Sequence, residues 1–264
     1  MSGSSFGPAP ERGVAIRGLI TAIRFLTIVP VPGRALEGPE ALGRAAGWFP
    51  LVGLALGGCL WLAHRLFSLA FPPLLATLLV LVTWKLLTGG IHLDGLADTL
   101  DGLTGRDPQE RLAIMRDSRI GVFGALGLIV AVLIGFLALA ELPGTVRGKA
   151  FLLAPVVGRH APLHLARAFQ PATPGQGSGS AFMKAVTLRA VSVGALVVIV
   201  AAAVILWPWG LLAAGIGIGL AWGLGRFLSR RLGGLTGDSL GAAVEVGEMG
   251  VLLAFAAFSF LRWI

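Results

Sequence analysis

Long uncharged, apolar stretches alternate with short polar segments along this chain. Four uncharged runs stand out, at residues 45–63, 66–84, 120–140 and 190–225. About 20 apolar residues are needed for an α-helix to cross the hydrocarbon core of a membrane. The last run is long enough for two crossings. Trp207-Pro208-Trp209 is its predicted turn, because proline cannot continue a helix and tryptophan favours the membrane interface. The pattern therefore predicts five membrane-spanning helices.

Two weaker segments extend this prediction. Residues 149–169 are apolar but interrupted by Arg159, His160, His164 and Arg167, so we expect this helix to line a wet cavity. Residues 239–264 carry Glu245 and Glu248, and acids within an apolar span are usually functional. Residues 18–29 are too short to span upright and predict a re-entrant or interfacial segment. The fold class is therefore an all-α, polytopic integral membrane protein with about six to eight transmembrane helices.

The composition adds limits. The chain has 264 residues and is 56% hydrophobic, which leaves room for one membrane-embedded catalytic domain at 18–264. Residues 1–17 are predicted to be a disordered tail, because their start is rich in Gly, Ser and Pro and contains no apolar core of a signal peptide. Residues 170–180 predict a flexible, exposed loop. Cys59 is the single cysteine, which excludes a disulfide framework.

The formal net charge of +8 does not indicate nucleic-acid binding, because the basic residues flank apolar spans. Two loops are especially basic: Arg106, Arg111, Arg116 and Arg119 lie in one, and Arg226, Arg230 and Arg231 in the other. Four predicted crossings separate these loops, so both should face the same side, which we expect to be the cytoplasm. The partner that the composition predicts is the lipid bilayer.

Six of the thirteen acidic residues fall between residues 94 and 117. On an α-helix, Asp94, Asp98 and Asp101 fall within roughly a 60° arc. Like charges at these spacings repel each other, and no Lys or Arg lies between them. This face therefore predicts a divalent cation, and oxygen ligands suit Mg²⁺. The alternative is a solvated amphipathic helix on the membrane surface.

Two more polar motifs carry chemistry. Arg116 and Arg119 flank Asp117, an arrangement that predicts either a phosphate clamp or a surface ion pair of little energetic value. Residues 233–239 place three glycines before a helix, where backbone amides can approach an anion. Glycine-rich turns before a helix are common, but Asp238, Glu245 and Glu248 would lie on about one face of that helix, which strengthens this interpretation.

Several segments together resemble the cobalamin synthase family, the adenosylcobinamide-GDP ribazoletransferases. The matching segments cover nearly the whole chain in the family's order: residues 25–27, 30–32, 49–53, 88–102, 115–121, 233–238 and 241–245.

The resemblance implies a Mg²⁺-dependent transferase of the cell inner membrane. It would join adenosylcobinamide-GDP to α-ribazole or its 5′-phosphate, give adenosylcobalamin or its 5′-phosphate, and release GMP at a site facing the cytoplasm. The implied metal ligands are Asp94, Asp98, Asp101, Asp117 and Asp238. The implied catalytic residues are Asp94, Asp101 and His92, with Asp101 and His92 competing to accept the proton of the attacking hydroxyl. The implied substrate-binding residues are Lys85, Arg116, Arg119, Gly237 and Glu245.

Two other classes stay open at this stage. A CDP-alcohol phosphotransferase also uses aspartates on membrane helices, but its signature needs Asp-Gly followed by Ala-Arg, and here Asp94-Gly95 is followed by Leu96-Ala97-Asp98. A cation transporter would use intramembrane acids as an ion path, yet the sequence contains no second copy of the aspartate motif. The sequence leaves a homo-oligomer open.

Overall fold

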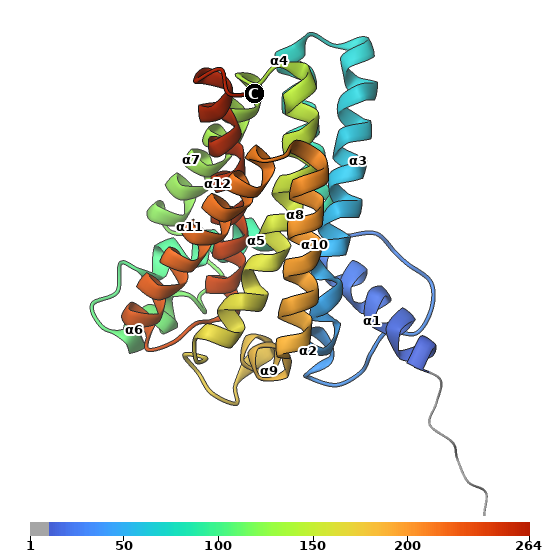
Figure 1. The fold of residues 1–264 in the computed structure, drawn as a ribbon. Helices are drawn as coiled ribbons and strands as arrows, with labels where there is room; N and C mark the ends of the chain where they lie inside the picture. The colour runs from blue at the N-terminus through green and yellow to red at the C-terminus, as the bar shows by residue number, and fades with distance from the viewer. Residues whose placement is uncertain (1–10) are drawn as a thin grey trace, which may run out of the picture.

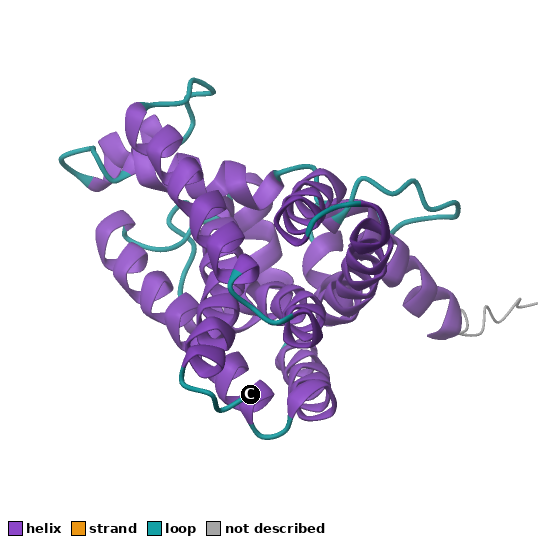
Figure 2. Ribbon diagram, turned by 90° about the horizontal axis from the view of Figure 1, so that it is seen from above, coloured by secondary structure: helices purple, strands orange, loops and turns teal. Residues whose placement is uncertain are grey.

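The chain folds into a bundle of helices, and the computed structural model describes residues 11–264. No strand occurs among these residues. The helices are α1 (Glu11–Leu26), α2 (Ala41–Ala45), η1 (Ala46–Trp48), α3 (Phe49–Ala70), α4 (Pro73–Leu87), α5 (Ile91–Gly102), α6 (Pro108–Ile114), α7 (Val122–Ala140), α8 (Gly144–Ala168), α9 (Gly177–Ala185), α10 (Leu188–Leu206), α11 (Trp209–Leu232) and α12 (Gly237–Phe260). Seen from above, the bundle shows helices and connecting loops, with no strand (Figure 2).

Helix α8 lies at the centre and packs against α3, α10, α11 and α12, so most of its residues are buried (Figure 1). Small residues let the helices approach closely, as is usual where lipid supplies no hydrophobic drive between helices. A Cβ on Gly57 of α3 would lie 2.8 Å from the carbonyl oxygen of Leu152 in α8. A Cβ on Gly217 of α11 would lie 2.7 Å from the carbonyl oxygen of Gly247 in α12. Because its neighbours shield it, α8 can carry polar residues at the depth of the membrane.

The prediction of an all-α, polytopic membrane protein is confirmed. Within residues 11–264, five helices are long and apolar enough to cross a membrane, or six if the bent pair α4 and α5 forms one span. The predicted turn at Trp207-Pro208-Trp209 is also confirmed, since α10 ends at Leu206 and α11 begins at Trp209. Residues 239–264 form most of α12, as expected.

The run at 66–84 is not one helix, and that expectation was wrong. Helix α3 ends at Ala70, and α4 begins at Pro73. Pro72 and Pro73 stop the first helix, because proline lacks the backbone N–H, and Pro73 fits the first position of the next one. Helix α4 is then followed by α5 at an angle of 84°. Gly89 and Gly90 make this bend with φ values of +61° and +69°, a region that favours glycine.

The folded part begins before residue 18, where the sequence placed its boundary. Helix α1 starts at Glu11, so residues 11–17 of the predicted tail are helical, while residues 1–10 lie outside the described part of the chain. Side chains of α1 hold the segment that follows it: Arg17 donates to the carbonyl oxygen of Ala35, and Arg24 donates to those of Val31 and Gly33. These contacts join residues 7 to 18 positions apart, which local composition does not reveal. Helix α1 lies at the side of the bundle, at the end where α2 and α9 lie (Figure 1).

The two basic segments meet at one end of the molecule, as predicted, although Arg226, Arg230 and Arg231 form the end of α11 rather than a loop. Arg111 Nη1 donates a 2.9 Å hydrogen bond to the carbonyl oxygen of Arg231. Between these residues the chain forms the long helices α7, α8 and α10, the short helix α9 and nearly all of the long helix α11, which contains Arg231. The aspartate segment and the turn before α12 are therefore on the same side of the bundle.

Candidate functional site

A cavity of about 180 Å³ opens between the end of α1 and helices α5, α8, α9 and α12. It brings together residues from seven helices: Phe25, Leu26, Leu42, Phe49, Ile91, His92, Asp94, Arg159, Pro162, Ser178, Gly179, Phe182, Gly237, Asp238, Leu240, Gly241 and Val244. The predicted residues His92, Asp94, Gly237 and Asp238 are among them. The cavity therefore unites the aspartate helix with the glycine-rich turn, as a single site requires.

The aspartates of α5 share one acidic region with Asp238 of α12. Asp98 lies within range of the negative charges of Asp94, Asp238 and Asp101. The ion pairs formed within residues 11–264 include none with Asp94, Asp98 or Asp238. Asp94 is exposed, whereas Asp98 and Asp238 are half-buried. The protein itself therefore leaves this negative charge uncompensated, which attracts a cation.

A close helix crossing brings Asp238 to the aspartate helix. A Cβ on Gly95 of α5 would lie 2.8 Å from the carbonyl oxygen of Asp238. On the other side of the crossing, a Cβ on Gly241 would lie 3.6 Å from the Cα atoms of Gly95 and His92. Thr236 fixes the start of α12, because its Oγ1 accepts the backbone N–H of Ser239 at 3.1 Å. Because Gly95 and Gly241 carry no side chains, α12 can approach α5 closely, and Asp238 comes near the aspartates of α5.

Asp101 lies on the same helix but is bound to the backbone. Its Oδ2 accepts the N–H of Gly121 at 2.7 Å, and its Oδ1 accepts the N–H of Gly124 at 2.8 Å. The side chain is buried and caps the N-terminus of α7, where a negative charge is favoured. Each oxygen of this predicted ligand therefore already accepts one backbone hydrogen bond.

His92 lies in the first turn of α5 and is buried, with 6% of its surface exposed. The helix begins at Ile91, so the two glycines delay its start but do not release His92 from it. Among residues 11–264, the imidazole forms no hydrogen bond or ion pair. His92 lines the cavity together with Asp94 and faces the same space as the acidic residues.

The loop at 115–121 lies outside the cavity lining. Arg119 Nη2 lies 2.6 Å from Asp117 Oδ2. Hydrogen bonds from the side chain and the backbone of Arg119 lower the pKa of the Asp117 carboxyl to about 2. Arg116 and Arg119 are both exposed. As folded, Asp117 and Arg119 form the surface ion pair that the sequence offered as the alternative to a phosphate clamp.

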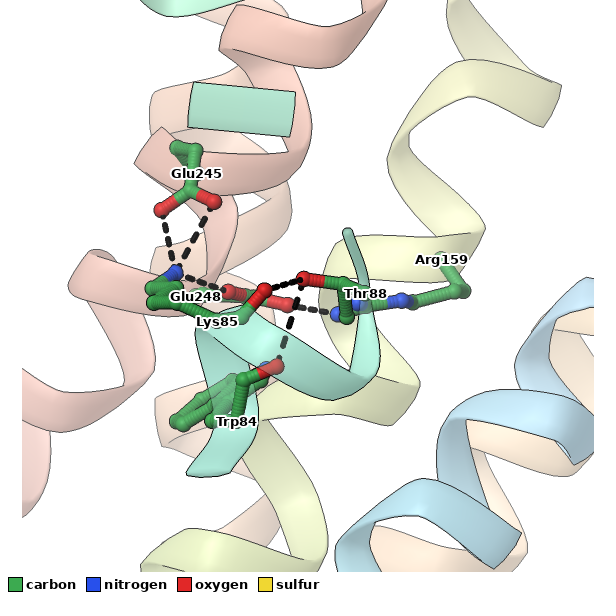
Figure 3. Close-up of polar contacts among 6 residues, drawn as sticks. All are labelled: Trp84, Lys85, Thr88, Arg159, Glu245 and Glu248. Atoms are coloured by element: carbon green, nitrogen blue, oxygen red, sulfur yellow. Dashed lines mark hydrogen bonds and ion pairs between the residues drawn. The ribbon is translucent and has the colours of Figure 1, made fainter. Parts of the chain in front are cut away.

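Lys85 and Glu245, both predicted to bind substrate, bind each other. Lys85 Nζ lies 2.7 Å from Glu245 Oε2 and 3.4 Å from Glu248 Oε2 (Figure 3). Glu248 also pairs with Arg159 of α8, so the figure shows a chain of alternating charges between α4, α8 and α12. Both glutamates are buried, and the charges compensate each other in the membrane interior. Arg159 alone of these four residues also lines the cavity.

The segment at 170–180 was predicted to be a flexible, exposed loop, and together with the rest of α9 it also helps to build the site. Leu235 exchanges backbone hydrogen bonds with Gln170 and Ala172, both of 2.9 Å. A Cβ on Gly179 would lie 2.6 Å from the backbone nitrogen of Gly237. Ser178, Gly179 and Phe182 consequently line the cavity, although residues 174–178 are exposed at their outer side.

Sequence reasoning therefore missed several lining residues, above all Arg159, Ser178, Phe25, Phe49 and Phe182. The polar stretch at 159–167 did predict a cavity lining for its helix, and Arg159 does line the cavity while pairing with Glu248. Phe25 and Phe49 lie in segments that resemble the family, but no feature of the sequence marked them or Phe182 as lining residues.

Comparison with known proteins decides the family. The profile of the family described as cobalamin-5-phosphate synthase matches residues 18–256. The chain belongs to this family. Proteins named adenosylcobinamide-GDP ribazoletransferase resemble it over most of their length. The one from Acetivibrio thermocellus is 33% identical over 92% of this chain and 98% of its own. The one from Ectopseudomonas mendocina is 40% identical over 89% of this chain and 96% of its own.

A third relative with the same name, from Geotalea daltonii, is 37% identical over 92% of this chain and 98% of its own. No solved structure matches the chain significantly. The matched region of the cobalamin-5-phosphate synthase family includes every element that lines the cavity, from α1 to α12.

Proposed function

We propose that the protein is a Mg²⁺-dependent adenosylcobinamide-GDP ribazoletransferase of cobalamin assembly. It joins adenosylcobinamide-GDP to α-ribazole or its 5′-phosphate and releases GMP. The family and the names of the relatives support the activity. They favour this activity over the phosphotransferase and the transporter that the sequence left open.

The observation that carries this proposal is the acidic region at the cavity. Asp94 and Asp238 line the cavity, and Asp98 lies within range of both charges. A diphosphate substrate is itself negative, so it cannot approach three uncompensated carboxylates without a cation. A divalent ion between carboxylates and phosphates removes this conflict.

The residues fit Mg²⁺ in their chemistry. Within residues 11–264 no three His, Cys, Asp or Glu side chains are arranged to hold an ion by themselves. Mg²⁺ does not require such a cage, because it usually keeps several waters and binds one or two carboxylates together with substrate phosphates. We assign Asp94 and Asp98 as these carboxylates, with Asp238 as a further ligand or as a partner of the ribazole hydroxyls. When bound, the ion would stabilise the negative charge that develops on the phosphoryl oxygens.

The reaction forms one bond and breaks another. A ribose hydroxyl oxygen of ribazole attacks the phosphorus atom that carries the cobinamide, and the bridging P–O bond to GMP breaks. GMP leaves with the electron pair of that bond, and the hydroxyl proton passes to a base. We assign the base to His92, because it lines the cavity with Asp94, whereas both oxygens of Asp101 already accept backbone amides.

Arg116 and Arg119 remain the proposed diphosphate ligands outside the cavity. Arg119 would have to exchange the Asp117 carboxylate for phosphate oxygens, which the planar guanidinium can bind in the same two-point geometry. We place this end of the bundle at the cytoplasmic side of the cell inner membrane, because its loops are rich in arginine.

The test is GMP release by the purified protein in detergent. Adenosylcobinamide-GDP and α-ribazole are supplied together with Mg²⁺, and each component is omitted in turn. We expect GMP only in the complete mixture, and loss of GMP release when a chelator removes the metal. GMP release without ribazole would indicate a hydrolase, and full activity with chelator would overturn the metal assignment.

A further inference from the structure

Three phenylalanine rings form a continuous aromatic wall on one side of the cavity. The rings of Phe25 and Phe49 are stacked with centroids 6.0 Å apart, and those of Phe49 and Phe182 are stacked with centroids 5.8 Å apart. The three residues come from the end of α1, the start of α3 and α9, so the wall exists only in the folded protein. All three line the cavity that contains Asp94 and Asp238, and Phe25 and Phe182 present more surface than Phe49, which is 1% exposed.

The cavity lining next to the three phenylalanine rings is also apolar. Leu26 and Leu42 also line the cavity, and neither leucine nor phenylalanine side chains offer a hydrogen-bond donor or acceptor. Stacked rings instead favour another flat, apolar ring system. The wall therefore suits a heteroaromatic base that has little hydrogen-bonding demand at its edge.

The size of the cavity restricts the ligand further. About 180 Å³ is well below the roughly 300–1,000 Å³ of sites that enclose a complete drug-sized ligand. The cavity can accept one bicyclic base and part of its ribose, but not a corrin macrocycle. Guanine presents O6 and N7 acceptors at its edge, and the phenylalanine side of the cavity offers no donor to them. Arg159, the charged donor of the lining, is 1% exposed and pairs with Glu248.

We infer that Phe25, Phe49 and Phe182 form the binding subsite for the dimethylbenzimidazole base of ribazole. The guanosine part of the other substrate lies outside this subsite. With the base against the wall, the ribose lies between the rings and the acidic region of Asp94 and Asp238, where the attacking hydroxyl is needed. This inference rests on the proposed function for the identity of the nucleoside, but its test does not depend on turnover.

The test measures equilibrium binding of α-ribazole and, separately, of GDP to the purified protein in lipid nanodiscs. Phe182→Leu removes one ring of the wall while keeping an apolar side chain of similar size. Phe151→Leu is the matched control, because Phe151 is equally apolar and buried but belongs to the other core cluster, around α8 and α12. A second wall variant, Phe25→Leu, guards against a folding defect specific to α9.

We expect both wall variants to weaken α-ribazole binding about tenfold, the usual effect of removing one stacked aromatic side chain. GDP binding should stay unchanged in both, and the control should bind both ligands like the wild type. Weaker GDP binding with unchanged α-ribazole binding would assign the wall to guanine and overturn the inference. Unchanged binding of both ligands, or an equal loss in the control, would also overturn it.

The same experiment separates the two proposals. If the wall variants weaken α-ribazole binding but the wild type releases no GMP, the subsite holds and the proposed reaction fails. If the wild type releases GMP and the wall variants have an unchanged KM for α-ribazole, the reaction holds and the subsite fails.

Discussion

Gly95 of α5 lies directly against Asp238 of α12, and the two backbones are too close for any side chain at position 95. A Cβ there would lie 2.8 Å from the carbonyl oxygen and 3.1 Å from the Cα atom of Asp238. The contact joins the two acidic elements of the site, which are far apart in the sequence.

Gly95→Ala should therefore move α5 away from α12 and reduce transfer at least about tenfold, because small displacements of catalytic groups have large effects on rate. Overpacking should also lower stability by about 1–3 kcal/mol. The measurements are kcat/KM and the melting temperature in detergent. Gly58→Ala is the control, since a Cβ at that helical position meets nothing within 4 Å. Equal behaviour of the two variants would show that the crossing does not position the site.

Asp94→Asn should abolish most of the transfer while the protein still purifies with an unchanged melting temperature. Asp94 is exposed and forms no ion pair within residues 11–264, so neutralising it removes no structural contact. We expect kcat/KM to fall at least tenfold, because losing a metal ligand costs several kcal/mol of transition-state stabilisation. Titration with Mg²⁺ should also require a higher concentration for half-maximal rate. The control is Glu141→Gln, which changes an exposed carboxylate between α7 and α8. Activity of Asp94→Asn above about a tenth of wild type would contradict the metal assignment.

Asp101→Ala should mainly lower the stability of the protein. The substitution leaves the buried N–H of Gly124 and the half-buried N–H of Gly121 without acceptors, at a cost of about 1–3 kcal/mol, seen as a lower melting temperature. Asp107→Ala provides the comparison, because Asp107 caps the exposed α6 through one 2.9 Å bond and its loss should cost about 1 kcal/mol. An Asp101→Ala protein with a normal melting temperature but no activity would restore Asp101 to the catalytic or metal-binding set.

Lys85→Met should destabilise the fold, because Glu245 would keep a buried charge without its cation. Breaking one partner of a buried pair costs about 3–5 kcal/mol. Adding Glu245→Gln to Lys85→Met should recover part of this loss. Lys184→Met gives the exposed comparison: its pair with Glu40 spans 3.7 Å at the surface and should contribute at most about 1 kcal/mol. A higher KM for adenosylcobinamide-GDP with an unchanged melting temperature in Lys85→Met would instead support the predicted role in substrate binding.

Arg116→Lys and Arg119→Lys separate a phosphate clamp from a surface ion pair. If the guanidinium groups hold the diphosphate, each variant should lose kcat/KM for adenosylcobinamide-GDP, since an ammonium cannot reproduce the two-point fork. The low pKa of Asp117 keeps its carboxylate charged across the neutral range, so protonation of Asp117 cannot explain a pH dependence in this range. Normal kinetics in both variants would leave phosphate binding to the metal and to the turn before α12.

The sequence alone determined the class of the fold and the helix face on which the acidic residues gather. Apolar runs of sufficient length predict spans because the hydrocarbon core has a fixed thickness, and α7, α10, α11 and α12 follow them closely. The period of the helix likewise predicted that Asp94 and Asp98 belong together. These are local properties, encoded by residues within a few turns of each other.

The tertiary structure decided which distant residues meet. Lys85 and Glu245 each looked like a substrate ligand until the fold paired them across 160 positions of sequence. Asp101 looked like Asp94 and Asp98 until the start of α7 came within hydrogen-bonding distance. The aromatic wall needs three segments that approach only when α1, α3 and α9 pack together. Such contacts depend on the summed packing of all helices, and a periodic pattern within one helix contains no information about them.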